Sequence, residues 1–359
     1  MKHSIPRVLL HDHLDGSYPL MTVLPELFRI SKKPYPFKGT FAEQCEQVKT
    51  LFNNVQLDIV ERFSNTTGVM QSRETLALAG EAYTRTRAEQ GFLYCEATIA
   101  PQYHMFGGMK EKEVIGALIE GIKRAESEFP QIEVNLLFTI GREVDLARSE
   151  ELIRLASECD RNYVVGVGLV CDEAGHPPEK HMVAFRLAKK LGLKISIHAG
   201  EWVATDYPAG SNSSERAGLA SRIRQLAERD KPSLLRNIRT AIFNLGADRV
   251  GHAIPLAYDN DLVKYVVENR IGIELCPGSN YSSGLIPNTG YLKIRDLLQS
   301  HVLCSLNPDD DLFLPQMPEV IDMVEAEYSF SGREFINFEH NAWMTRFGRR
   351  KHDHPAIWD

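Results

Sequence analysis

The sequence predicts an α/β fold in which eight parallel strands close into a (β/α)8 barrel. Eight short runs are rich in Val, Ile, Leu and aromatic residues, and amphipathic stretches separate most of them. Such alternation implies a parallel sheet covered by helices. A barrel of about 250 residues would leave roughly 100 residues of this 359-residue chain for insertions.

The eight expected strands follow one another along the chain. They extend over Arg7–His13, Phe92–Ala100, Ile132–Gly141, Tyr163–Val170, Lys194–Ala199, Asp248–Ala253, Ile271–Pro277 and Val302–Asp309. Helical spacing of apolar residues marks four of the connections between them. These expected helices are Lys112–Glu128, Ala147–Cys159, Lys180–Leu191 and Asp259–Asn269.

Two long segments account for the residues beyond a minimal barrel. Leu14–Gly91 is mostly helical in pattern and is expected to cap the barrel mouth. Trp202–Arg236 is expected to extend the loop after the fifth strand, where it would either cover the substrate or decorate the surface. Because the chain shows no internal repeat, low-complexity tract or linker, residues 1–359 are expected to form one domain.

Composition excludes several classes of function. The chain is 43% hydrophobic and 25% charged, and its formal charge of -7 gives no reason to expect binding to nucleic acid or to an anionic membrane. No secretory signal or membrane-spanning stretch is evident, so a cytoplasmic protein is expected. Its six cysteines are scattered without a C-x-x-C pair, which argues against a disulfide framework or a thiolate zinc site. The oligomeric state cannot be predicted from the sequence.

Two histidines close the first expected strand. Residues i and i+2 of a strand share a face, so His11 and His13 point the same way while Asp12 points to the other. Alone, an H-x-H pair is more often a packed or surface pair than a metal site. Here His198 and Asp309, each at the end of a β-rich run, supply two further ligands.

In a (β/α)8 barrel the carboxyl ends of the strands meet at one mouth, where active sites lie. Glu201 and Asp310 follow the fifth and eighth expected strands and His252 lies at the end of the sixth, so all three are expected at the same rim. Three His and one Asp suit a single zinc ion whose sphere is completed by water, and such an ion lowers the pKa of that water to about 7. The alternatives are a surface carboxylate at Glu201, a core histidine at His252 and a solvated acidic turn at 309–311.

Four spaced segments resemble the adenosine deaminase family of the metal-dependent amidohydrolase superfamily, in their order and positions. They are His11-Asp12-His13-Leu14-Asp15-Gly16, His198-Ala199-Gly200-Glu201, Arg249-Val250-Gly251-His252 and Ser305-Leu306-Asn307-Pro308-Asp309-Asp310. Residues 67–71 and 274–280 are also similar to this family. The resemblance covers nearly the whole chain, and it implies the same barrel that the strand pattern predicts.

The resemblance implies a role for each selected residue. The metal ligands would be His11, His13, His198 and Asp309. Glu201 would donate a proton to purine N1 and later to the departing ammonia, and His252 would orient the attacking water. The substrate would contact His13, Asp15, Cys171 and Asp310, with Asp310 at purine N7 and Asp15 at the ribose.

Departures from the family pattern concern the substrate. Residues 168–171, Gly-Leu-Val-Cys, stand where the adenosine enzymes usually carry an Asp-Leu-Ala-Gly-like segment. The backbone N–H of Cys171 would still reach purine N3, although its side chain would reshape the pocket. Glu173 and residues 175–178 are similar to the adenine deaminase branch, which commonly has Glu where Asp15 stands. The two cues disagree, and Asp15 favours a nucleoside.

The sequence therefore predicts a zinc-dependent deaminase that converts adenosine or 2'-deoxyadenosine, with water, to inosine or deoxyinosine and ammonia. The first alternative is an adenine or modified-purine deaminase. Another amidohydrolase reaction is disfavoured because no lysine ends the fourth strand. A non-catalytic nucleoside-binding barrel is disfavoured by Glu201 and His252, which a binding protein does not need.

Overall fold

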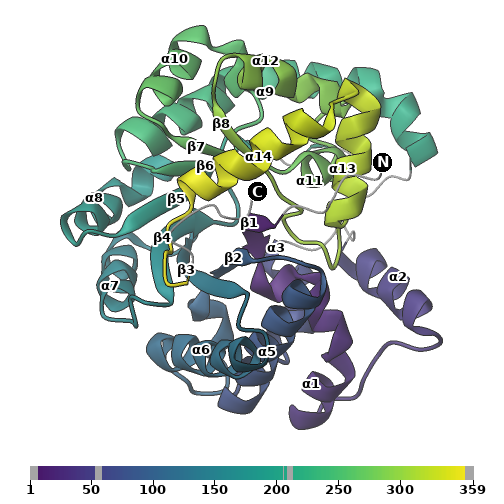
Figure 1. The fold of residues 1–359 in the computed structure, drawn as a ribbon, viewed down its shortest axis with the longest axis vertical. Helices are drawn as coiled ribbons and strands as arrows, with labels where there is room; N and C mark the ends of the chain where they lie inside the picture. Colours follow the sequence, from purple (N-terminus) through teal and green to yellow (C-terminus); the bar gives the residue numbers. More distant parts are fainter. Residues whose placement is uncertain (1–6, 53–58, 205, 208–212, 352–359) are drawn as a thin grey trace.

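The computed structural model describes residues 7–52, 59–204, 206–207 and 213–351. Its eight strands form one sheet in sequence order, each parallel to the next, and helices surround them (Figure 1). This arrangement confirms the predicted (β/α)8 barrel. The strands are β1 (Val8–His13), β2 (Tyr94–Ile99), β3 (Glu133–Gly141), β4 (Val164–Val170), β5 (Lys194–Ala199), β6 (Arg249–His252), β7 (Gly272–Leu275) and β8 (Leu303–Leu306).

The barrel closes where β1 meets the segment that follows β8. The backbone N–H of His13 donates to the carbonyl of Asp309 at 3.2 Å. Lower down, the side-chain oxygen Oδ1 of Asn307 accepts from the N–H groups of Leu10 and His11, both at 3.1 Å. An amide side chain thus takes the place of a strand carbonyl, and the closure sets His13 beside Asp309.

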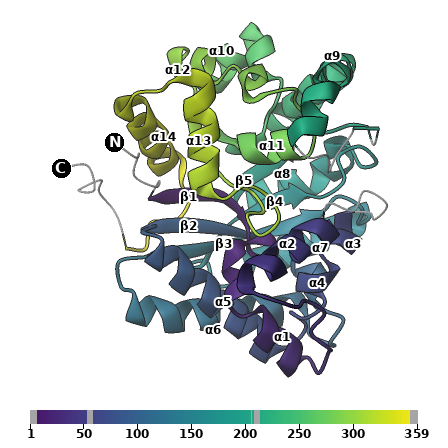
Figure 2. The ribbon, with the colours of Figure 1, turned by 90° about the vertical axis from the view of Figure 1, so that its right-hand side faces the viewer.

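The outer layer consists of the helices between the strands, which lie on both sides of the sheet in Figure 2. All four predicted helices are confirmed, with ends that differ by at most two residues. The helices after β2 are α6 (Glu111–Glu128), α7 (Leu146–Ser157), α8 (Met182–Lys190), α9 (Ser213–Phe243), α10 (Asn260–Glu268), α11 (Pro277–Ser282), α12 (Ile294–Gln299), α13 (Met317–Tyr328) and α14 (Gly332–Thr345).

The described residues of the segment 14–91 are mostly helical, as predicted, but only some of them lie at the barrel mouth. Phe63 and Thr67 line the pocket there, whereas α5 packs along α6 in the outer layer. Short helical turns over Leu14–Gly16 and Tyr18–Thr22 precede the longer helices. These are α1 (Leu24–Ile30), α2 (Phe41–Phe52), α3 (Ile59–Arg62), α4 (Ser64–Thr67) and α5 (Arg73–Glu89).

The expectation of an extended loop over Trp202–Arg236 is wrong for most of that segment. Helix α9 begins at Ser213 and continues to Phe243, with Pro232 inside it. Proline lacks an N–H donor and usually ends or kinks a helix, so Pro232 disfavours a continuous helix at this position. An apolar stripe holds the helix on the barrel instead. Its buried members include Ile223, Leu226, Ala227, Leu234 and Ile238.

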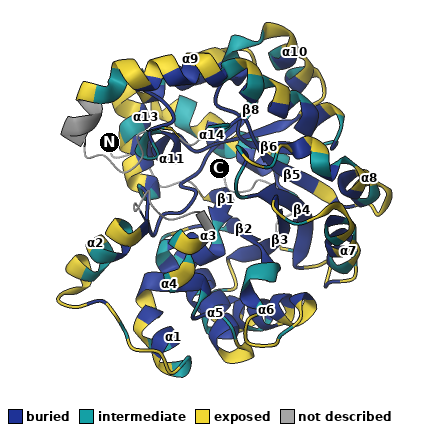
Figure 3. Ribbon diagram, turned by 180° about the vertical axis from the view of Figure 1, so that it is seen from behind, coloured by how far each residue is buried: buried dark blue, intermediate teal, exposed yellow. Residues whose placement is uncertain are grey.

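Burial follows the barrel architecture. Figure 3 shows buried residues along the strands and exposed residues on the outer faces of the helices. At the amino end of the barrel, Val8 and Leu10 of β1 pack with Ala342 and Trp343 of α14. Within the described ranges, no helix is long and apolar enough to cross a membrane. The assignment of residues 1–359 to one domain stays a prediction.

A buried arginine joins the segments that carry the histidines and the acidic cluster. Arg87 of α5 is 1% exposed, and its guanidinium pairs with Asp12 at 2.8 Å and with Asp311 at 2.9 Å. Asp12 therefore points away from His11 and His13, as the strand alternation predicts. Burial raises the pKa of Asp12 to about 7, against the opposing effect of the Arg87 charge.

We predict that Arg87→Met lowers the free energy of unfolding by about 3–5 kcal/mol, because it leaves two buried carboxylates without their counter-charge. Urea denaturation followed by circular dichroism measures this loss. Lys112→Met is the control: its ion pair with Glu158, at 3.0 Å, is exposed and should contribute less than about 1 kcal/mol. Equal losses for the two variants would contradict the role assigned to Arg87.

Candidate active site

Imidazoles from two strands converge on one carboxylate at the barrel mouth. Nε2 of His11 and Nε2 of His13 lie 3.2 and 3.3 Å from Oδ1 of Asp309. Nε2 of His198, at the end of β5, lies 3.0 Å from Nε2 of His13. Two ligand atoms on one tetrahedral zinc ion, each about 2.0–2.1 Å from it, would be separated by roughly 3.3 Å. The spacing and the donor types therefore fit a single metal ion.

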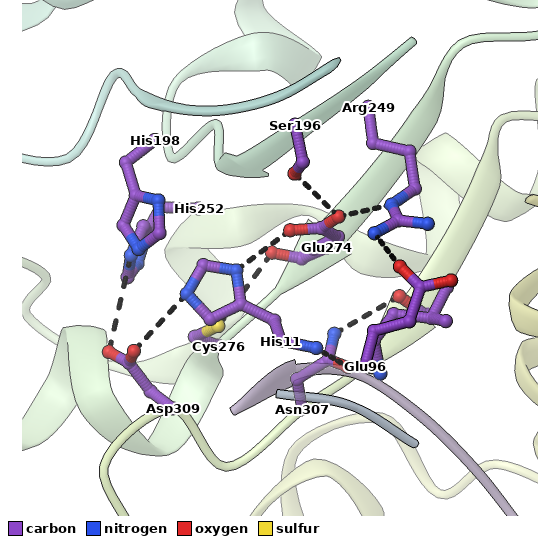
Figure 4. Close-up of polar contacts among 12 residues, drawn as sticks. His11, Glu96, Ser196, His198, Arg249, His252, Glu274, Cys276, Asn307 and Asp309 are labelled. Carbon is purple, nitrogen blue, oxygen red and sulfur yellow. Dashed lines mark hydrogen bonds and ion pairs between the residues drawn. The ribbon is translucent and has the colours of Figure 1, made fainter. Parts of the chain in front are cut away.

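Residues that lie behind His11, on the side away from Asp309, orient its imidazole (Figure 4). Oε2 of Glu274 lies 2.8 Å from Nδ1 of His11, which turns Nε2 of the ring toward Asp309. Glu274 in turn accepts from the hydroxyl of Ser196 at 2.8 Å and from the guanidinium of Arg249. A carboxylate behind a histidine ligand fixes the orientation of the ring and raises its basicity. The sequence analysis gave Glu274, Ser196 and Arg249 no role, although Arg249 and Glu274 lie in segments that resemble the family.

Electrostatics at the cluster favour a positive charge. Although burial opposes the charged form of His13, the Asp310 and Asp309 carboxylates raise its pKa to about 9. Burial and the neighbouring histidines hold the pKa of His198 well below its usual value, so its imidazole is neutral. A metal ligand must be a neutral imidazole, and a divalent ion supplies the positive charge that the acids favour.

His252 lies beside the cluster but is held differently. Its Nδ1 lies 3.0 Å from the amide oxygen of Asn280, and its Nε2 lies 3.6 Å from Oε2 of Glu201 and 4.0 Å from Oδ2 of Asp309. Among the described residues, two groups have ligand atoms that all lie within 4.8 Å of one another. The first group is His11, His198, His252 and Asp309. The second group is His13, Asp309 and Asp310.

Glu201 occupies a turn that is fixed from behind by another glutamate. The carboxylate of Glu173 accepts the N–H groups of Gly200 and Glu201, both at 2.9 Å, and the amide N–H of Asn237 at 2.8 Å. Burial raises the pKa of Glu201, which favours its protonated form. Both properties suit a proton donor. The sequence analysis noted Glu173 only as a similarity to another branch, because no local pattern links it to this turn.

A pocket of about 110 Å³ lies in front of these groups. Of the nine residues selected from the sequence, all except His11 line it, and His11 contacts Asp309 behind its wall. The sequence analysis did not select the remaining lining residues. They are Phe63, Thr67, Ala100, Tyr103, Thr139, Val170 and Trp202.

Three of the selected residues have an unusual backbone conformation. Cys171, His252 and Asp309 have φ angles of 76°, 62° and 69°. This left-handed region is costly for residues other than glycine, and such strain concentrates at functional sites. The glycine usual in the family at position 171 fits this conformation without strain. Burial raises the pKa of the Cys171 thiol well above its usual value, so the thiol is not an activated nucleophile.

Comparison with known families supports the resemblance. The model of the family described as adenosine deaminase matches residues 6–207 and 233–354. The chain belongs to the adenosine deaminase family. Adenosine deaminase 1 of Streptomyces coelicolor is 31% identical over 365 residues, which cover 95% of this chain and 82% of that protein. The adenosine deaminase of Clostridium acetobutylicum is 29% identical over 314 residues, which cover 86% and 82%.

Solved structures show the same fold. An adenine deaminase from Arthrobacter aurescens has a TM-score of 0.75 at 21% identity and covers 96% of this chain and 95% of its own. An amidohydrolase from Burkholderia ambifaria, solved with bound Zn, has a TM-score of 0.74 at 19% identity, with 97% and 87% covered. Arabidopsis ADAL in complex with GMP has a TM-score of 0.69 at 20% identity, with 97% and 94% covered.

We predict that the purified protein holds one divalent ion per chain and that His13→Ala and Asp309→Ala both lose it, because each removes one of the four protein ligands and the remaining three bind the ion more weakly. Elemental analysis after dialysis gives the stoichiometry. His252→Ala is the matched comparison: it should keep the ion but lose activity. If His252→Ala loses the metal and His13→Ala keeps it, the ligand assignment is wrong.

Proposed function

We propose that this protein is a zinc-dependent hydrolytic deaminase that converts adenosine and 2'-deoxyadenosine to inosine and deoxyinosine with release of ammonia. One observation supports the proposal most directly. Nε2 of His252 lies 3.6 Å from Oε2 of Glu201, and both residues line the same pocket beside the predicted metal ligands. Proton transfer and orientation of water need these two groups, and simple binding needs neither.

The residues have distinct parts in the mechanism. His11, His13, His198 and Asp309 would hold the zinc ion, which when bound lowers the pKa of water to about 7. Because Nδ1 of His252 donates to Asn280, its Nε2 is free to accept a proton from water and orient it. Glu201, whose protonated form burial favours, donates its proton to purine N1 as water adds at C6 and loses a proton to His252. That proton passes by way of Glu201 to the leaving amino group. The C6 hydroxyl then gives its proton back to Glu201 as ammonia departs and the carbonyl forms.

The pocket supports a purine without a phosphate. Its walls contribute the carboxylates of Asp15 and Asp310, and none of the described residues that line it is Lys or Arg. Phosphate sites in proteins are built from such cations or from helix N-termini. Asp310 would hold purine N7, Cys171 would present its backbone N–H to N3, and Asp15 would accept a sugar hydroxyl. A cytoplasmic location belongs to the same proposal.

Adenine or a modified purine is the alternative substrate. The Arthrobacter structure is named as an adenine deaminase, and another neighbour from Arabidopsis is named as an N6-methyl-AMP deaminase. The side chain of Cys171 narrows the pocket where the family usually has glycine, which favours a smaller or reshaped ligand. Ammonia release from a panel of adenine, adenosine, 2'-deoxyadenosine and AMP tests the proposal directly. A protein that deaminates only the free base would contradict it.

We predict that Glu201→Gln retains the metal and the affinity for substrate but lowers kcat by at least about 100-fold, since a positioned proton donor contributes on that scale. Steady-state kinetics and elemental analysis measure the two effects. In the wild type, kcat/KM should fall as the pH rises through the raised pKa of Glu201, because the donor must be protonated. Near-normal turnover of the variant would place the acid elsewhere.

Asp15→Ala tests the sugar contact. Loss of a hydrogen bond to a charged group costs about 1.5–3 kcal/mol, so kcat/KM for adenosine should fall roughly 10- to 150-fold. Adenine, which has no sugar, should be nearly unaffected. Asp15→Asn is the control because it keeps an oxygen acceptor and should lose less. Equal losses on both substrates would instead place Asp15 in support of His13 and the metal.

A further inference from the structure

His104 is a buried histidine that contacts Asp15 but is not itself among the residues that line the pocket. It closes the helical turn Pro101–His104 that follows β2, and it is 0% exposed. Its Nε2 lies 3.2 Å from Oδ2 of Asp15, and its Nδ1 lies 3.1 Å from the carbonyl oxygen of Met70. The ring thus joins three segments that are far apart in the sequence.

Both ring nitrogens of His104 face oxygen acceptors. The contact between Nδ1 and the Met70 carbonyl fixes the ring, and the contact between Nε2 and Oδ2 gives one oxygen of Asp15 a fixed partner. Together the two contacts hold the carboxyl of Asp15 in one orientation.

The orientation of the Asp15 carboxyl matters because a second acid, Asp310, lies close to it in the same pocket. Asp15 and Asp310 both line the pocket, and burial together with the nearby charges of Asp309 and Asp15 raises the pKa of Asp310 well above its usual value. A β-carbon at Gly16 would come within 1.9 Å of Oδ1 of Asp310, so the backbone beside Asp15 packs directly on that carboxylate. Without a partner, the Asp15 side chain would gain freedom to turn away from Asp310.

We propose that His104 is a positioning residue that occupies one oxygen of Asp15 and so holds the other toward the pocket, where it accepts a hydroxyl of the substrate sugar. This inference rests on the proposed function, in which Asp15 binds the sugar of a nucleoside. It assigns the preference for nucleoside over free base to a pair of residues rather than to Asp15 alone. Nothing in the immediate sequence around His104 predicts the contact, because its partners are Asp15 and Met70.

Two substitutions separate positioning of Asp15 from general support of the fold. The amide nitrogen of Asn reaches the place of Nδ1, so His104→Asn keeps a donor to Met70 and loses the contact with Asp15. The amide nitrogen of Gln reaches the place of Nε2, so His104→Gln keeps a donor to Asp15. Each variant removes one of the two hydrogen bonds of the ring.

We expect His104→Asn to lower kcat/KM for adenosine by about tenfold or more, chiefly through a higher KM, and to leave adenine turnover and metal content unchanged. His104→Gln should keep the wild-type ratio of kcat/KM values for adenosine and adenine. In the Asp15→Ala background, His104→Asn should cause no further loss on adenosine, because the two residues act as one unit.

Three results would overturn the inference. They are an equal loss on adenosine and adenine in His104→Asn, no loss on either, or a ratio in His104→Gln as altered as in His104→Asn. If His104→Asn does not fold, the ratio in His104→Gln still decides, because a changed ratio contradicts a role exerted through Nε2. A wild type that does not deaminate adenosine would defeat the proposed function instead, so the two failures are distinguishable.

Discussion

The closure of the barrel between β1 and the end of β8 is the constraint on which the site depends. The N–H of His13 donates to the carbonyl of Asp309, and Asn307 fills the ladder below it with a side-chain oxygen. Because both histidines of β1 share one face, this single junction brings two imidazoles to one carboxylate. β5 then needs to supply only His198 to complete the ligand set. A shift of one residue in this register would turn His11 and His13 away from Asp309.

Compensation of buried charge is the second requirement, and two arginines provide it. Arg87 pairs with Asp12, which lies between the ligands His11 and His13 in the sequence, and with Asp311, two residues after the ligand Asp309. Arg249 pairs with Glu274, behind His11, and with Glu96. Each guanidinium makes an otherwise costly carboxylate tolerable in the barrel interior. Although burial opposes the charged form of Glu274, the Arg249 charge lowers its pKa to about 2, so this carboxylate stays charged behind His11.

The sequence predicted the fold and eight of the residues that line the pocket, because the signals for both are local. Strand alternation and the barrel rule place the ends of strands at one mouth, and eight of the nine selected residues line the pocket there. The roles of three residues could not be predicted in this way, because each depends on a contact with a residue far away in the sequence. They are Glu274, Glu173 and His104. Helix α9 was missed because Pro232 interrupts a helical pattern that tertiary burial sustains. The left-handed conformations of His252 and Asp309 also depend on the closed barrel rather than on residue type.

Two features of the sequence favour different substrates: Glu173 is similar to the adenine deaminase branch, whereas Asp15 favours a nucleoside. The structure shows which of the two residues can contact the substrate. Glu173 resembles the adenine deaminase branch, yet it is 2% exposed, does not line the pocket, and accepts N–H groups from Gly200, Glu201 and Asn237. A carboxylate used in this way positions the proton donor for any purine, so it carries no information about the sugar. Asp15 does line the pocket, with one oxygen already held by His104. The residue that can contact a sugar therefore decides between the cues, and it favours the nucleoside.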